Sequence, residues 1–166
     1  MFTRVADFHE GWEVEREGTL KILKALTDAS LGQAVAPGSR TLGRIAWHTV
    51  VSVGEMARHA GLAIDAPPDD APAPATAASF AETYEKVSAQ LPKAVAAAWT
   101  DADLLGEIEM YGERWSRGKA LAVLIAHQTH HRGQVTVLMR QAGLAVPGVY
   151  GPSREEWATY GMPTQD

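Results

Sequence analysis

The segment that decides the fold is AHQTHHRGQ, residues 126–134, which lies in the middle of a predicted amphipathic helix. Ser116 is a suitable N-cap for this helix, and the pattern continues to about Ala142 and stops at Gly143. The predicted buried stripe of this helix consists of Leu121, Leu124, Gln128, His131, Val135 and Leu138. His127 lies beside this stripe. Two histidines therefore occupy positions where such a helix normally carries leucine.

The spacing of these two histidines is compatible with metal binding. Residues four apart on a helix are separated by a rise of about 6 Å and an angular offset of about 40°. The imidazoles of His127 and His131 can therefore reach one divalent ion at about 2.0–2.1 Å. The pair alone is equally compatible with core histidines that bind carbonyls or each other. His48, on a separate inward-facing stripe, favours a metal, and three nitrogen ligands would leave one coordination position open.

Three further helices are predicted from hydrophobic periodicity. The first spans about residues 4–26, and the second begins after Pro37-Gly38-Ser39, with Ser39 as its N-cap, and ends at Gly61. The third spans about residues 77–99, and Pro92 should kink it or split it in two. With no convincing series of strands, four helical segments predict an all-α protein, a four-helix bundle in one domain spanning residues 1–166.

The connecting segments carry weaker signals. Residues 64–77 contain four prolines and are predicted to form a stiff linker, and residues 105–115 alternate weakly, as in a short extended segment. The tail, residues 147–166, is predicted to be irregular, with one short helical piece near residues 153–157.

Composition excludes several classes of function. The net charge is −5 and no basic run is present, which argues against nucleic-acid binding. The absence of cysteine excludes disulfides, Cys-type zinc sites and a thiol nucleophile on the chain itself. No segment resembles a signal peptide or an apolar run of about 20 residues. We therefore expect a cytoplasmic protein that does not bind membranes.

Two polar residues are candidates for roles beside the histidines. Glu55 follows His48 by seven residues and shares its helix face, so it could hold an imidazole N–H or act as a general base. A solvated glutamate is the alternative. Gln134 shares the face of His127 and could form a hydrogen bond into the site, whereas His130 points about 100° away from His131 and is expected in a second layer or at the surface.

Several segments of the chain resemble the DinB/YfiT-like superfamily. They are GERWSRGKAL at residues 112–121, HQTHHRGQ at 127–134, LMRQAGL at 138–144, and Pro147. His48, which follows GRIAW at residues 43–47, matches the first metal ligand of that family. The similarity covers the second and fourth helices well and the other two only by pattern and length.

The resemblance implies an up-down-down-up bundle, frequently homodimeric, with a divalent metal held by His48, His127 and His131. Zn is the first expectation, and Ni or Fe are alternatives. Members with known activity are mostly metal-dependent transferases or isomerases that use low-molecular-weight thiols such as mycothiol or bacillithiol. We therefore expect a thiol S-transferase acting on a small-molecule substrate. The alternatives are a metal-dependent hydrolase of small amides or esters, with Glu55 as a catalytic base, and a non-enzymatic, stress-related metal-binding dimer.

Overall fold

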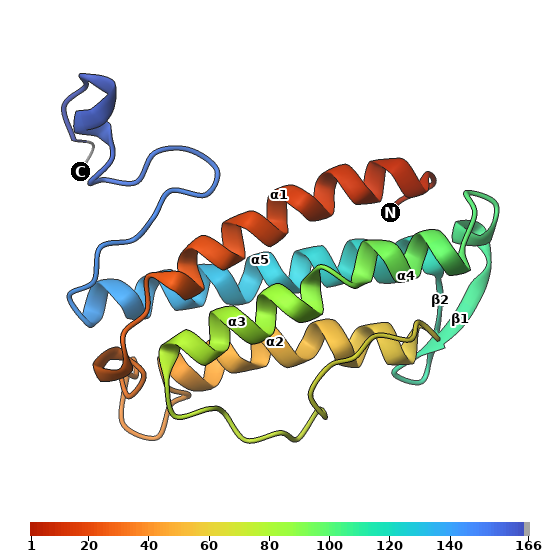
Figure 1. Cartoon of the computed structure of the whole chain (residues 1–166), viewed down its shortest axis with the longest axis horizontal. Coiled ribbons are helices and arrows are strands. Elements are labelled where there is room, and N and C mark those ends of the chain that lie inside the picture. Colours follow the sequence, from red (N-terminus) through yellow and green to blue (C-terminus); the bar gives the residue numbers. More distant parts are fainter. Residues whose placement is uncertain (165–166) are drawn as a thin grey trace.

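The computed structural model describes residues 1–164 and shows a helix bundle (Figure 1). Its helices are α1 (Val5–Lys24), α2 (Leu42–His59), α3 (Ala77–Ser88), α4 (Leu91–Ala98) and α5 (Arg117–Gln141). Helices α3 and α4 follow each other along one direction and together form the third helical segment of the bundle. The four segments run in the predicted up-down-down-up order (Figure 1). No helix within the described residues is long and apolar enough to cross a membrane.

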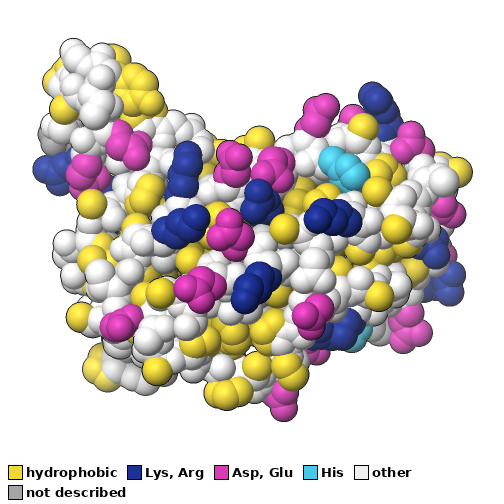
Figure 2. Space-filling view, in the orientation of Figure 1, with side chains coloured by type: hydrophobic (Ala, Val, Ile, Leu, Met, Phe, Trp, Pro, Cys, Tyr) yellow, Lys and Arg dark blue, Asp and Glu magenta, His cyan; other side chains and the backbone are white. Residues whose placement is uncertain are grey.

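The core forms where the apolar stripes of the helices meet. Phe8 and Trp12 on α1 are fully buried, and so are Phe80 and Tyr84 on α3. The indole Nε1 of Trp12 donates a hydrogen bond to the carbonyl oxygen of Ser88, 3.0 Å away, so the largest buried side chain also satisfies its polar atom. Apolar burial of this kind is the main stabilising contribution in a helix bundle. Acidic and basic side chains are interspersed on the face that α1, α3 and α4 present in Figure 2.

The N-terminus of α2 differs from the prediction. Ser39 is not the N-cap; Thr41 is, and its Oγ1 accepts a hydrogen bond from the backbone N–H of Arg44 at 3.2 Å. Thr41 also forms an isolated antiparallel bridge with Ala34, which keeps its backbone extended until the helix begins. The predicted end is correct, because Gly61 follows α2 with φ 78°, a left-handed conformation that glycine adopts without steric cost.

Pro92 divides the third helical segment into α3 and α4, as the sequence indicates. α3 ends at Ser88 and α4 begins at Leu91, so Pro92 lies in the first turn of α4. The first backbone N–H groups of a helix have no acceptor within the helix. Proline in the first turn therefore removes no intrahelical hydrogen bond.

A β-hairpin lies beside the C-terminal end of α2 (Figure 1). Strand β1 (Glu107–Met110) pairs antiparallel with β2 (Glu113–Ser116), and this confirms the predicted extended segment. Tyr111 and Gly112 form the turn with φ values of 54° and 80°, as the two central positions of a tight hairpin turn require. Ser116 then caps α5 as predicted, its Oγ accepting from the N–H of Lys119 at 3.1 Å.

After α5 the chain leaves the bundle and forms a separate tail (Figure 1). A short 3₁₀ helix spans Trp157–Tyr160, a few residues later than the predicted helical piece near 153–157. The start of the tail is attached to the bundle, because the hydroxyl of Tyr150 lies 2.7 and 2.8 Å from the two carboxylate oxygens of Glu15 on α1. The last two residues of the predicted tail, 165–166, lie outside the described residues.

Candidate metal centre

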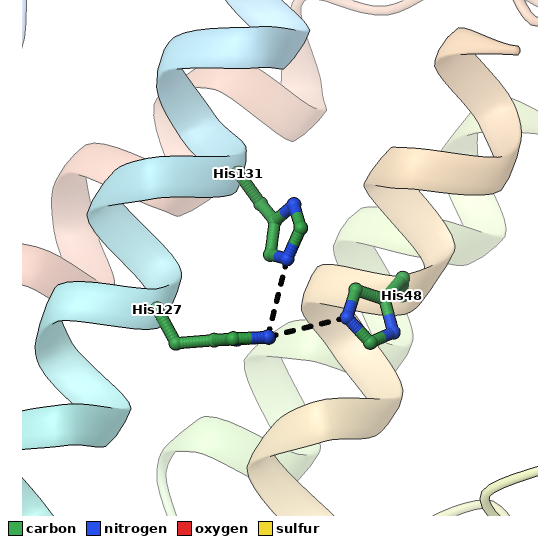
Figure 3. Close-up of side chains that lie close together, drawn as sticks. All are labelled: His48, His127 and His131. Atoms are coloured by element: carbon green, nitrogen blue, oxygen red, sulfur yellow. Dashed lines mark hydrogen bonds between the residues drawn. The ribbon is translucent and has the colours of Figure 1, made fainter. Parts of the chain in front are cut away.

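The three predicted ligands meet at the contact between α2 and α5 (Figure 3). His48 projects from the middle of α2, and His127 and His131 project from successive turns of α5. His131 is buried, with 7% of its surface exposed, while His48 and His127 are half-buried. The imidazoles therefore lie between the two helices and remain partly accessible.

The three Nε2 atoms point toward one another. His127 Nε2 lies 3.2 Å from His48 Nε2 and 3.1 Å from His131 Nε2. One ligand atom from each histidine lies within 4.8 Å of the others. Nitrogen ligands about 2.05 Å from a tetrahedral zinc ion lie about 3.3 Å apart. The donor set and its spacing thus fit one divalent ion with little rearrangement.

The protonation states also suit metal binding. Burial, followed by the neighbouring His131 and Arg40, lowers the pKa of His48 to about 4. Burial, followed by the neighbouring His131 and His48, lowers the pKa of His127 to about 4 as well. The pKa of His131 is lowered by burial, against an opposing effect of its hydrogen bond to Gln134. All three rings are neutral at pH 7, and a neutral imidazole is the form that binds metals.

Gln134 determines which nitrogen of His131 is available. Its Oε1 lies 2.7 Å from His131 Nδ1 and is an acceptor, so Nδ1 carries the proton and Nε2 keeps its lone pair for the metal position. The Nε2 of Gln134 contacts His130 Nε2 at 3.2 Å. His130 is exposed and stands outside the ligand set, in agreement with the orientation expected from the helix.

A buried glutamine sets the register of the two ligand-bearing helices. Gln128 is fully buried beside His127, and its Nε2 donates to the carbonyl of Thr49 at 2.9 Å and to the hydroxyl of Ser52 at 3.2 Å. Sequence analysis placed Gln128 on the buried stripe without giving it this role. Because Thr49 adjoins His48, this cross-link positions the ligands of α2 and α5 relative to each other.

Two pockets lie near the histidines, one on each side along α2, and His48 and His127 line only the first. The first, here named the hairpin pocket, has a volume of about 260 Å³ and is lined by His48, Ser52, Glu55, Met56, Tyr111, Val123 and His127. The second, here named the Arg40 pocket, has a volume of about 470 Å³ and is lined by Val35, Ser39, Arg40, Ile45, Gln134, Val137 and Leu138. The metal position therefore has space beside it for small molecules.

Glu55 lies in the hairpin pocket but does not hold an imidazole. Within the described chain its carboxylate forms a hydrogen bond with Tyr111, whose hydroxyl donates to Glu55 Oε1 at 3.2 Å. Burial, together with the charge of Glu55, raises the pKa of Tyr111 to about 12, so the hydroxyl remains a donor at neutral pH. Gln134 has the imidazole-orienting role that was considered for Glu55, while the general-base role of Glu55 stays a prediction.

Two neighbours of the site, Tyr111 and Arg40, are not predicted by the sequence patterns. Tyr111 shares a pocket with His48 and His127 only because the hairpin folds back beside α2, and the weak alternation of residues 105–115 gave no register. The Tyr-Gly dipeptide between two alternating runs is the signal that could have located the turn. His59 is exposed, and its ring lies 4.9 Å from that of Tyr111, outside the ligand cluster.

The fold and the site together define the class: an up-down-down-up helix bundle in which three histidines converge, from α2 and α5, to form a candidate metal site. The chain belongs to the DinB family, whose model matches residues 1–166. It is 46% identical over 162 residues to the uncharacterized protein YrdA of Bacillus subtilis (strain 168), a match that covers 98% of this chain and 97% of that protein.

Two solved structures share the fold. A DinB-like protein from Bacillus cereus ATCC 10987 superposes with a TM-score of 0.87 at 44% identity, covering 90% of this chain and 100% of that one. The DinB-like protein YjoA from Bacillus subtilis superposes with a TM-score of 0.65 at 20% identity, covering 86% and 96% of the two chains. The second likeness concerns the fold alone.

Proposed function

We propose that this protein is a metal-dependent transferase that attaches a low-molecular-weight thiol to a small electrophile. The observation that carries the proposal is the convergence of three neutral imidazole nitrogens beside a pocket. Within residues 1–164 this cluster contains three protein ligands, and a structural zinc site usually has four, often with cysteine. Zn²⁺ suits such a nitrogen donor set, with Ni²⁺ or Fe²⁺ as alternatives.

When bound, the divalent ion supplies a Lewis acid that lowers the pKa of a thiol placed at the open position. The sulfur must come from a cosubstrate, because the chain contains no cysteine. As the S–H bond breaks, the proton passes to the carboxylate of Glu55 in the hairpin pocket, with the Tyr111 hydroxyl orienting that carboxylate. The sulfur then forms a bond to the electrophilic carbon, and the leaving group departs with the electron pair of the bond that breaks.

Hydrolysis of small amides or esters is the second candidate. The position of Glu55 supports it, because the carboxylate shares the hairpin pocket with His48 and His127 and could accept a proton from an attacking water. A non-enzymatic metal site is less well supported, since pockets lie on both sides of the cluster.

The test begins with protein purified without an affinity tag. Elemental analysis should find about one transition-metal ion per chain, and the metal-loaded protein should then be assayed with cellular thiols and a chromogenic electrophile. Thiol-dependent turnover that is lost in His127→Ala and kept in His130→Ala supports the transferase. Thiol-independent ester or amide hydrolysis that is lost in Glu55→Gln, with metal content unchanged, supports the hydrolase instead. Absence of turnover with every thiol contradicts the transferase.

A further inference from the structure

The Arg40 pocket has the dimensions and walls of a small-molecule site. Its volume of about 470 Å³ lies within the range of about 300–1,000 Å³ that is typical of ligand pockets. The buried side chains of Ile45 and Leu138 line it, and Val35 and Val137 line it with 63% and 55% of their surfaces exposed. Large apolar side chains that remain exposed around a concave surface favour an apolar occupant.

The pocket also carries one positive charge that the chain leaves unpaired. No hydrogen bond or ion pair within residues 1–164 involves the guanidinium of Arg40, and no acidic residue lines the pocket. By contrast, six other arginines of the described chain pair with carboxylates: Arg4, Arg16, Arg58, Arg114, Arg132 and Arg140. A free guanidinium at the wall of an apolar pocket, in a protein of net charge −5, is suited to an anionic ligand.

The pocket is not lined by the three histidines, but Gln134 connects it to the metal centre. Gln134 lines the pocket and at the same time accepts the hydrogen bond from His131 Nδ1. Ile45 precedes His48 by three residues, which places the two side chains on neighbouring turns of one face of α2. A ligand in this pocket therefore lies beside the metal ligands, on the side opposite the hairpin pocket.

We propose that the Arg40 pocket binds a small organic carboxylate, with its apolar chain against Ile45 and Leu138 and its carboxylate on the guanidinium of Arg40. A guanidinium matches a planar carboxylate through two parallel hydrogen bonds. As a substrate site the pocket rests on the proposed function: the carboxylate would anchor an acid that carries a separate electrophilic carbon, and the leaving group on that carbon would depart with the bonding electron pair as the sulfur bonds to it.

Binding can be measured without turnover, using matched six-carbon probes. Hexanoate, hexanamide and hexylammonium are titrated into metal-free and zinc-loaded protein, with calorimetry for affinity and backbone amide NMR shifts for location. The metal-free protein shows whether hexanoate binds without coordinating zinc. We expect hexanoate to bind about tenfold more tightly than hexanamide, since a charge-assisted hydrogen bond replaces a neutral one. The shifts should include Val35, Ile45 and Val137.

Variants of Arg40 test whether its guanidinium binds the carboxylate of hexanoate. Arg40→Gln should reduce the affinity for hexanoate about tenfold and leave that for hexanamide unchanged, and Arg40→Lys should retain part of the preference. The matched control is Arg44→Gln, because Arg44 is exposed four residues away and does not line the pocket. Since Arg40 is exposed, its replacement leaves the fold intact, and circular dichroism verifies this.

The outcomes separate this inference from the proposed function. Equal affinities for hexanoate and hexanamide, or equal effects of the Arg40 and Arg44 variants, overturn the inference even if thiol transfer is found. Arg40-dependent hexanoate binding without any metal binding supports the pocket and contradicts the proposed function. If the Val35 and Val137 amides shift when ligand-free protein is diluted and hexanoate leaves them unchanged, the face is a contact between copies and the inference is overturned.

Discussion

Helix α5 carries two polar clusters on different faces, and they differ in how their polar atoms are satisfied. Toward α1, Arg132 donates through Nη2 to Glu15 Oε2 at 2.6 Å and through Nη1 to Thr19 Oγ1 at 3.0 Å. Toward α2, the Nε2 atoms of the three histidines face one another, and His127 Nδ1 has no partner among the described residues. The first cluster is complete without a ligand, whereas in the second an ion would bind the three converging Nε2 atoms and leave His127 Nδ1 without a protein partner.

The difference teaches that burial of polar groups does not by itself indicate function. Arg132 and Glu15 are both buried, yet each charge meets its opposite, so the pair joins α1 to α5 and has no site for a ligand. The histidines are less buried but leave converging lone pairs, which is the feature that a metal ion uses. The predictions below change each cluster in turn.

The largest effect on stability is expected from Arg132→Ala. It leaves the buried carboxylate of Glu15 without its partner, and breaking a buried ion pair costs about 3–5 kcal/mol. Urea denaturation measures the loss in free energy of unfolding. Arg16→Ala is the control, because it breaks a more exposed pair with Glu13 on α1 and should cost less than about 1 kcal/mol. Equal losses in the two variants would show that the buried cluster is not a structural cross-link.

Removal of a ligand should abolish the stabilisation by metal. A zinc concentration of about 100 times Kd raises the free energy of unfolding by about 2.7 kcal/mol. We expect a zinc-dependent increase of this kind in the wild-type protein and none in His127→Ala at the same zinc concentration. His130→Ala, on the same helix but outside the cluster, should respond as the wild type does. A full zinc response in His127→Ala would contradict the three-histidine site.

Gln134→Ala should weaken metal binding without abolishing it. The substitution removes the acceptor that holds the proton on His131 Nδ1, and loss of such an orienting partner typically costs about 10–100-fold in metal affinity. Competition with a fluorescent chelator measures the change. Gln141→Ala, at an exposed position of the same helix, is the matched control. An affinity equal to that of the wild type would mean that packing alone orients His131.

The smallest effect is expected from Tyr111→Phe. It removes the hydrogen bond to Glu55 and keeps the ring, so metal affinity should be unchanged while kcat falls by up to about tenfold if Glu55 is the base. Glu55→Gln should reduce kcat more strongly. If Tyr111→Phe lowers the metal affinity and leaves kcat unchanged, Tyr111 stabilises the metal site and does not take part in the reaction.

Local signals predicted much of the fold and the ligand cluster. Ser116, Gly61 and Pro92 act through local backbone geometry and hydrogen bonding, so their positions alone indicate where helices begin and end. Ser39 failed as a cap because Thr41 is held in place by the bridge to Ala34, a contact that periodicity does not show.

The remainder of the site depends on how elements meet in space. His127 and His131 share one helix, and their convergence follows from spacing, whereas the approach of His48 is set by the contacts of Gln128 across the interface. The partnership of Arg132 with Glu15, more than 100 residues away in the chain, requires the register of two helices. Tyr150 contacts Glu15 only because the tail after α5 turns back toward α1, which the sequence pattern does not show.

The central claim is that His48, His127 and His131 hold one divalent ion and leave a coordination position to a small molecule. X-ray absorption spectroscopy of untagged, zinc-loaded protein tests it most directly. The account predicts one zinc per chain, three imidazole nitrogens and at least one light non-protein ligand at about 2.0–2.1 Å, with the imidazole signal reduced in His131→Ala. A chain that retains no stoichiometric metal, or a zinc environment unchanged by that substitution, would contradict it.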